Sequence, residues 1–297
     1  MKPSTKDRVI DALLIAMMIL PFLGAMALNI LTKPLSEGIT VTGAQIYFTI
    51  DMPLQPLYIT EAQVVSAAVV IALLGLCLFL TRKLSVRPTS KRQVIAEMIV
   101  ETMDKLVAGN MGQRFMGFAP FITAILGLSG LSSLATLLGL FPPTSDINIV
   151  AGWAILVFIL ITYYKLKGGV LPYLKGFLEP IPVMLPMNIL SEFSTPVSMA
   201  FRHYGNVMSG SVIAVLIAAA LSGLSSLVLG WLPGALGDIP FLRVGLPAVL
   251  SLYFDIFSGC MQAFIFAMLT MLNVSIGFPE ELYEKRQAKK LAKKANK

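Results

Sequence analysis

Charged side chains are scarce in this chain. Only 13% of its 297 residues are Asp, Glu, Lys or Arg, against about a quarter in soluble domains. Hydrophobic residues make up 56%, and the mean hydropathy is +0.80. A water-soluble fold this apolar would have too little polar surface to stay dispersed. Together with several apolar runs of about 20 residues, this predicts an integral membrane protein.

Cysteine and histidine are also rare. The two cysteines, Cys77 and Cys260, lie far apart in apolar runs, and His203 is the one histidine. This spacing excludes a zinc cluster, and we expect both cysteines to act as small buried hydrophobes. The phosphate-loop pattern G-x-x-x-x-G-K-[ST] is absent, so nothing indicates that the chain binds or hydrolyses ATP itself. We expect no cofactor, no metal site and no enzymatic activity of the chain alone.

The net charge of +7 comes from short basic clusters beside apolar runs and from the tail after Phe278. A nucleic-acid-binding face would gather these residues on one surface, so we expect no nucleic-acid partner. The clusters at 82–92, at 165–175 and in the tail instead follow the positive-inside rule. With an even number of crossings, all three fall in the cytoplasm together with the N-terminus. We therefore predict that both termini are cytoplasmic.

Six apolar runs predict an all-α, polytopic membrane protein. They cover about residues 9–31, 59–80, 118–141, 147–164, 186–232 and 244–276, the last two forming a long tilted hairpin. The first run follows basic residues, so it is either a signal peptide or, as its length favours, a retained signal-anchor helix. Residues 32–60 are expected outside, with strand-like patches such as 46–50. Interleaved apolar and charged residues at 92–108 predict an amphipathic helix on the cytoplasmic surface.

The fifth run contains an arginine at membrane depth. Placing Arg202 there costs about 2.5–3.5 kcal/mol on insertion scales. Polar residues accompany it along one helical face, within about 40° of one line at ~100° per residue. These residues are Asn188, Thr195, Ser198, Asn206 and Ser209, while Glu192 lies about 80° to one side. Interhelical hydrogen bonding explains single hydroxyls, but not a guanidinium, so a functional role is expected for Arg202.

The sixth run repeats this pattern with Asp255 as a second ionisable group. Ser251, Asp255, Ser258, Gln262 and Asn273 fall within about 60° of one line if the run is a regular α-helix. Two polar stripes on adjacent helices are expected to face each other or a common aqueous path. His203 lies about 100° off the first stripe, which favours a hydrogen-bonded or interfacial histidine over a proton relay.

Three motifs in order resemble the subunit a family of F-type ATP synthases. P-V-S-M-A-F-R-H-Y-G-N-V-M-S-G at 196–210 is similar to the family signature around its arginine. F-P-P-T-S-D-I-N at 141–148 is similar to the P-T-x-D-x-N segment, and Q-A-F-I-F at 262–266 followed by M-L-T resembles the last helix. The resemblance covers about residues 60–278. It implies one membrane domain over 1–297, with an N-terminal helix and external loop (1–58), a core (59–278) and a basic cytoplasmic tail (279–297).

The resemblance also implies roles for particular residues. Arg202 corresponds to the stator arginine that faces the rotating ring of c subunits, and Ser198, Asn206 and Gln262 match polar positions of the ion path. Two positions depart from the family pattern, because Ser211 replaces a common acid and Asp255 replaces a His or Glu. We therefore expect Asp255 to pass the ion on the outer side. Glu192 is expected to serve the cytoplasmic side, with Ser211, Asn188 and Asp146 as further possible positions.

The implied function is proton translocation in the Fo sector of an F-type ATP synthase in a bacterial plasma membrane. Its partners would be the c-subunit ring, the b subunits of the peripheral stalk, the F1 ATPase and the lipid bilayer. Sodium remains an alternative coupling ion. Two other classes stay open from the residues alone. A secondary transporter would need an internal repeat, which the sequence does not show, and a non-conducting scaffold would leave Arg202 without a role.

Overall fold

The computed structural model describes residues 5–32, 43–53, 55–86, 90–178, 181–229, 249–250, 252–281, 283–285 and 288. Its long helices are α1 (Thr5–Thr32), α2 (Glu61–Thr81), α3 (Lys91–Met111), α4 (Ala119–Leu134), α5 (Ile147–Leu166), α7 (Leu185–Leu229) and α9 (Gly259–Ile276). The short helices are η1 (Gln113–Phe118), η2 (Ala135–Leu138), η3 (Pro143–Ser145), α6 (Val170–Gly176) and η4 (Pro182–Met184). A π-helical turn, η7 (Leu252–Ser258), leads into α9, and β1 (Ile46–Ile50) pairs with β2 (Leu57–Thr60) as an antiparallel hairpin.

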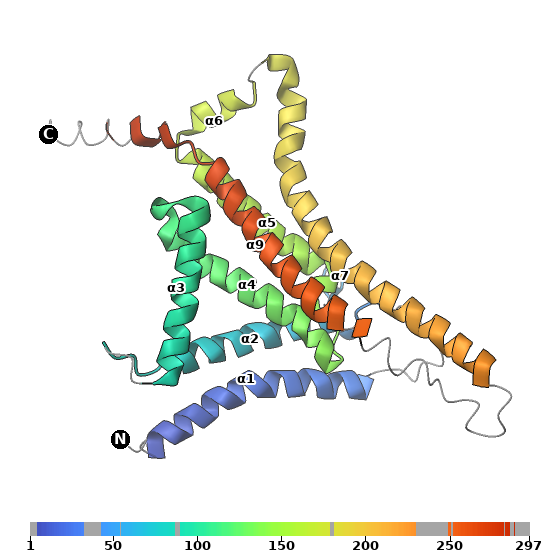
Figure 1. Cartoon of the computed structure of the whole chain (residues 1–297). Helices are drawn as coiled ribbons and strands as arrows, with labels where there is room; N and C mark the ends of the chain where they lie inside the picture. The colour runs from blue at the N-terminus through green and yellow to red at the C-terminus, as the bar shows by residue number, and fades with distance from the viewer. Residues whose placement is uncertain are drawn as a thin grey trace.

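Six helical spans of the described residues are long and apolar enough to cross a membrane. They are α1, α2, η1 with α4 and η2, α5, η4 with α7, and η7 with α9. This confirms the predicted all-α, polytopic fold, and the expected strand at 46–50 is β1. The turn between the fifth and sixth spans, 230–248, lies outside the described residues. Helix α3 runs across the ends of the neighbouring helices (Figure 1), as expected for a surface helix.

Helix α7 is the longest element, with 45 residues. At 1.5 Å per residue it extends about 68 Å, more than twice the hydrocarbon thickness, so it must tilt, bend or extend beyond the hydrocarbon layer. Pro196 lies inside it and removes one backbone N–H from the helical ladder. Figure 1 shows α7 changing direction along its length and passing diagonally over α9 and α5.

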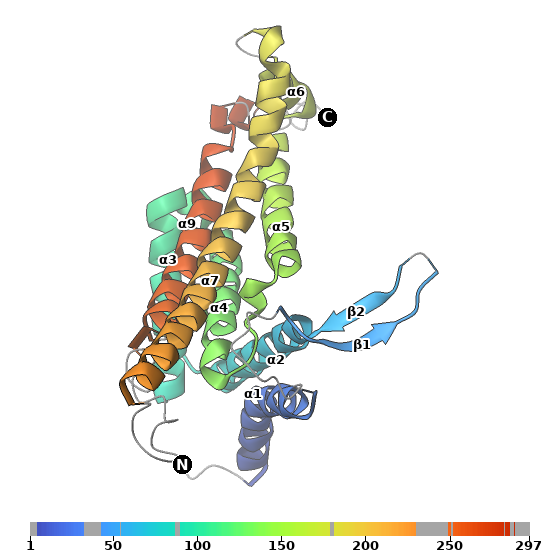
Figure 2. The same ribbon diagram turned by 90° about the vertical axis from the view of Figure 1, so that its right-hand side faces the viewer.

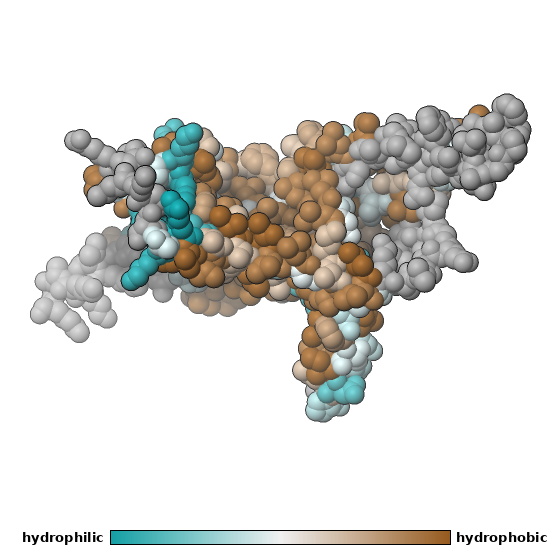
Figure 3. Space-filling model, turned by 90° about the horizontal axis from the view of Figure 1, so that it is seen from below, coloured by the Kyte–Doolittle hydropathy of each residue, from teal (hydrophilic) through white to brown (hydrophobic). Residues whose placement is uncertain are grey.

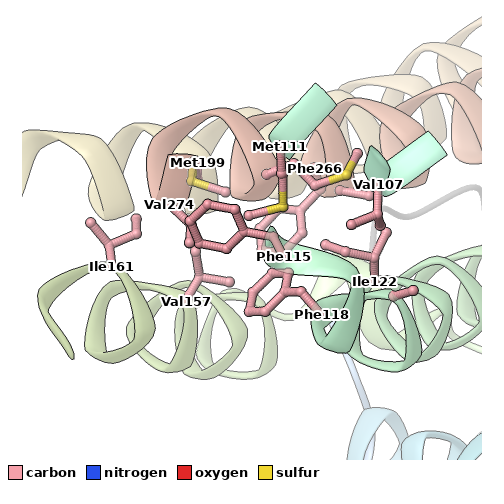
Figure 4. Packing of buried hydrophobic residues seen from close by; sticks show 13 residues of the cluster. Val107, Met111, Phe115, Phe118, Ile122, Val157, Ile161, Met199, Phe266 and Val274 are labelled. Carbon is pink, nitrogen blue, oxygen red and sulfur yellow. The ribbon is translucent and has the colours of Figure 1, made fainter. Parts of the chain in front are cut away.

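The main core lies where α3, η1, α4, α5, α7 and α9 meet. Phe266 and Met271 of α9 pack there with Val157 of α5 and Ile122 of α4, and all four are at most 1% exposed. Figure 4 shows Phe266, Val157 and Ile122 interdigitating between the helices, with Met199 of α7 at the edge. Because lipid is as apolar as these side chains, van der Waals packing rather than hydrophobic exclusion holds such helices together. Because one side of α7 packs against this core, the core determines which side of α7 points outward.

Basic residues gather at one end of the bundle, which we call the basic end. There Arg82, after α2, forms salt bridges with Asp7 and Asp11 of α1 at 3.0 and 2.8 Å. Arg92 of α3 binds Asp11 at 2.6 Å and stacks over the ring of Phe79. These contacts join α1 to α2 and α3, and they place the basic cluster at 82–92 beside the start of α1.

One expectation about side-chain burial is wrong. Cys77 in α2 and Cys260 in α9 are both exposed on the surface of the chain and unpaired in the part that the structure describes. Each lies in a helix of a predicted span, so each faces the apolar surroundings of the bundle rather than its interior. Composition places a cysteine in apolar surroundings, but it does not distinguish protein from lipid.

Candidate functional site

The polar stripe of α7 lies on the surface of the chain. Ser198, Arg202, Asn206 and Ser209 are all exposed, whereas Met199 and His203 on the adjacent side of the helix are buried. Among the described residues, no carboxylate lies within 4.0 Å of the Arg202 guanidinium. The surrounding surface is apolar, with Phe201 62% exposed. A cation without a carboxylate partner among the described residues therefore stands on the exposed polar stripe of a candidate membrane span, where charge is costly unless a partner supplies the opposite sign.

The two predicted polar stripes meet at one pair of side chains. Asn206 of α7 donates from Nδ2 to Oγ of Ser258 in η7, at 2.9 Å. Asp255 belongs to the same turn, and its side chain lies outside the described part of the chain. Gln262 follows in α9 and is buried, 3% exposed. The prediction that the stripes face each other is confirmed at Asn206 and Ser258.

The helical geometry assumed for the sixth run is wrong over part of its length. Residues Leu252–Ser258 form a π-helix, in which each hydrogen bond spans i to i+5. The added residue in that turn breaks the ~100° periodicity between Asp255 and Gln262. The polar positions of the sixth run therefore do not form one straight stripe. Turns of this kind are frequent at functional sites, and nothing in the residue pattern alone distinguishes one from regular α-helix.

At the basic end, Glu192 of α7 is bound by a lysine. Lys165 Nζ donates to both carboxylate oxygens of Glu192, at 2.8 and 2.7 Å, and the hydroxyl of Tyr173 lies 3.4 Å from Oε1. Burial, and then the negative charge of Glu192, raise the pKa of the Tyr173 phenol above its ordinary value. These groups border a cleft of about 360 Å³, which Ser191 and Asn188 also line.

A second hollow lies next to this cleft along α7. It has a volume of about 450 Å³, and Ser191 borders both hollows. Its polar lining includes Ser194, Ser198, Arg202 and Asn273, so it reaches the arginine from the basic end. The structure thus brings together Glu192, Ser198 and Arg202 along one recessed, partly polar surface. Gln262 does not line it.

His203 points into the protein, away from Arg202. It is fully buried, and its Nε2 lies 3.3 Å from Oγ of Ser129 in α4. Trp153 and Phe266 pack against the imidazole edge-to-face, with ring centroids 6.0 and 5.5 Å away. The sequence predicted either a hydrogen-bonded or an interfacial histidine in preference to a proton relay. The structure shows the hydrogen-bonded one.

The three further candidate positions make local hydrogen bonds. Ser211 donates to the backbone oxygen of Met208 at 2.8 Å, and Asn188 donates to that of Phe177 at 2.9 Å. Asp146 accepts from the backbone N–H of Asn148 at 2.9 Å and so caps the N-terminus of α5. For Asp146, helix capping explains the residue type without a role in the ion path.

Sequence reasoning missed two charged residues. Lys165 was interpreted only as a marker of topology, although it binds Glu192. Glu61, the first residue of α2, is 4% exposed and accepts hydrogen bonds from Asn29 of α1 and, at 3.1 Å, from the backbone N–H of Phe141. An acid at the start of an apolar run was a signal for Glu61. The Lys165 pairing joins residues 27 apart and left no such signal.

Comparison with known proteins agrees with the motifs. The family model for the ATP synthase A chain matches residues 63–275. ATP synthase subunit a of Bacillus subtilis (strain 168) is 34% identical over 241 residues, covering 77% of this chain and 96% of its own. That of Bacillus pumilus (strain SAFR-032) is 32% identical over 228 residues, covering 73% and 91%. ATP synthase subunit a 1 of Crocosphaera subtropica is 31% identical over 204 residues, covering 67% and 78%. The chain therefore belongs to the ATP synthase A chain family, as a multi-pass membrane subunit of the Fo sector.

Proposed function

We propose that this chain is the proton-conducting stator of an F-type ATP synthase and that Arg202 couples proton flow to rotation of the c-subunit ring. The observation that carries the proposal is the exposed Arg202 in the polar stripe of α7, within 4.0 Å of which no carboxylate of the described residues lies. A ring carboxylate passing this face would supply the missing negative charge. The b subunits of the peripheral stalk and the F1 ATPase would complete the complex in a bacterial plasma membrane, with both termini of this chain cytoplasmic.

Arginine suits this position for electrostatic reasons. A carboxylate on a rotating partner must be neutral when it faces lipid and charged when it passes the stator. A fixed positive charge nearby lowers the pKa of that carboxyl group and so favours proton release. The guanidinium stays protonated at any relevant pH, so Arg202 cannot pass the proton on itself. It also repels a cation leaking between the two sides, which would otherwise release about 2.3 kcal/mol per 100 mV without rotation.

The cytoplasmic half-channel is proposed to follow the two hollows at the basic end. The cleft at Glu192 and the groove to Arg202 share Ser191, and together they give a recessed route from the end of the bundle to the arginine. The Lys165 ammonium neutralises Glu192 at the entrance. That pairing favours a role for Glu192 in fixing the shape and hydration of the route over a role as a freely titrating carrier.

The outer half-channel is proposed to reach the ring near the π-helical turn. Asn206 and Ser258 form a polar bridge there, Asp255 lies in the same turn, and Gln262 follows in α9. The carboxylate of Asp255 is the proposed proton-passing group, since Ser211 offers only a hydroxyl. A proton would move from Asp255 to the ring on one side of Arg202 and leave through the groove on the other.

The test replaces the arginine in the assembled complex. Arg202→Ala should reduce ATP synthesis in energised membrane vesicles by at least 100-fold, because no fixed cation then favours proton release from the ring carboxyl group. Tyr204→Phe, which removes one hydroxyl two residues after Arg202 on α7, is the control and should retain synthesis. Coupled synthesis near the original rate in Arg202→Ala would refute the proposal. Measuring synthesis with and without sodium distinguishes a proton from a sodium ion as the coupling ion.

A further inference from the structure

The β1–β2 hairpin carries an apolar face that the core fold does not use. In its antiparallel register, Phe48 pairs with Ile59, and Ile50 pairs with Leu57. Residues directly opposite one another in such a pair project from the same face, so these four aliphatic and aromatic side chains share one. The intervening pair, Thr49 and Tyr58, projects from the other face. The hairpin is thus an amphipathic two-stranded ribbon, and it precedes the part of the chain that matches the family model.

This apolar face is open. Phe48 is 56% exposed, and Ile50 and Leu57 are each 44% exposed. None of the four residues on the face carries charge. An isolated two-stranded ribbon is marginal in water, and an exposed apolar strand surface promotes aggregation. We therefore expect another apolar phase to cover this face in the native protein.

The base of the hairpin is fixed to the membrane domain. The backbone N–H of Glu61, the first residue of α2, donates to the oxygen of Gln45 at 2.8 Å. Helix α2 runs from there to Arg82 at the basic end, and its 21 residues span about 32 Å, close to the hydrocarbon thickness. The hairpin therefore begins where the far membrane surface must lie.

The hairpin extends sideways and so stays near the level of the far membrane surface. Figure 2 shows β1 and β2 projecting sideways from the beginning of α2, clear of the other helices. In Figure 3 the hydrophobic surface of the bundle continues onto this projection, and hydrophilic residues appear at its end. A ribbon that leaves the end of a membrane span sideways stays near the level of that membrane surface, and we infer that its apolar face continues the surface that contacts lipid.

We propose that the hairpin lies in the interfacial layer of the outer leaflet, with Phe48, Ile50, Leu57 and Ile59 inserted among lipid chains. Tyrosine favours this layer because its ring is apolar and its hydroxyl remains hydrated, which fits Tyr58 on the face opposite the inserted side chains. Asp51 at the tip remains with the headgroups and water. The ribbon would anchor the outer end of α2 laterally, independently of ion conduction.

The experiment compares adjacent positions on the two faces. Single cysteines at Phe48→Cys, Ile50→Cys or Thr49→Cys are made in the assembled complex with Cys77→Ala and Cys260→Ala, labelled with an environment-sensitive fluorophore and reconstituted in phosphatidylcholine vesicles. ATP-driven proton uptake by the labelled complex shows that each variant is folded. We expect lipids with a shallow nitroxide to quench positions 48 and 50 at least threefold more than position 49. Aqueous iodide should show the reverse order.

Two results would overturn the proposal. Equal quenching of all three positions by iodide would mean that the ribbon projects into water. Protection of positions 48 and 50 from both quenchers would mean that a protein surface, and not lipid, covers the apolar face. Neither result bears on Arg202, so the failure of this proposal is distinguishable from failure of the proposed function.

Discussion

At the scale of single residues, two neighbours on α7 have opposite environments. Arg202 points out of the chain, whereas His203 is buried between Ser129, Trp153 and Phe266. The ~100° step between successive helical residues is enough to separate them. Helical periodicity therefore predicted which of the two belongs to the polar face. It did not predict Ser129 as the hydrogen-bond partner, because that residue is 74 positions away on another helix.

The burial of His203 leads to a prediction about its role. His203→Leu should leave proton pumping within about twofold of the original, because the imidazole faces the protein interior and not the arginine. Stability should fall by about 1–3 kcal/mol, since the buried hydroxyl of Ser129 loses its partner. The measurements are ATP-driven dye quenching and thermal unfolding of the complex in detergent.

A second substitution distinguishes a structural role of His203 from a role as a proton relay. Adding Ser129→Ala to His203→Leu removes the unpaired hydroxyl and should recover part of the lost stability, because loss of both partners costs less than loss of one. A tenfold loss of pumping in His203→Leu with unchanged unfolding temperature would instead assign the histidine to the ion path.

At the scale of elements, α4 and α9 are in close contact at a glycine. A Cβ built on Gly259 would lie 2.6 Å from Cβ of Ser133, which is too close for either helix to remain in place. Small residues at such contacts allow membrane helices to pack closely. Gly259 directly follows the π-helical turn. The contact with Ser133 therefore also fixes the end of that turn, and with it the position of Ser258, to which Asn206 donates.

Gly259→Ala is therefore expected to lower the stability of the complex. Overpacking at such a contact costs about 1–3 kcal/mol, which outweighs the ~1 kcal/mol that alanine gains in helix propensity. Gly130→Ala on α4 is the control, since a Cβ there meets nothing within 4 Å. Thermal unfolding should therefore rank Gly259→Ala below the original and Gly130→Ala at or above it. The opposite ranking would mean that α4 and α9 can move apart without loss of stability.

Much of the fold at this scale was predictable from hydropathy. The apolar runs predicted all six spans, and the strand pattern at 46–50 predicted β1, because both signals depend only on residues close together in the sequence. The π-helical turn was not predictable, since its residues read equally well as α-helix. The exposed positions of Cys77 and Cys260 were missed because apolar residues cover both the core and the lipid-facing surface of a membrane protein.

At the scale of the whole molecule, polar groups divide into those that hold the bundle together and those that face outward. Glu61 accepts hydrogen bonds from Asn29 and Phe141, and Arg82 binds Asp7 and Asp11, so these charges are satisfied within the chain. In the α7 stripe, Asn206 and Ser209 make hydrogen bonds, but no carboxylate of the described residues lies within 4.0 Å of Arg202. The motifs at 141–148, 196–210 and 262–266 identified the family, while the Glu192–Lys165 pair and the connected hollows required the structure because they join distant segments.

The central claim is that the face of α7 around Arg202 meets the acidic face of the c-subunit ring. Cysteine cross-linking tests it most directly, with Ser209→Cys on that face and a cysteine beside the ring carboxylate. Ile155→Cys on α5, a residue 56% exposed but on another helix, is the control. We predict that mild oxidation in membranes forms a disulfide to the c subunit from position 209 and not from position 155. Cross-linking from position 155 alone, or from neither position in an active complex, would contradict the stator assignment.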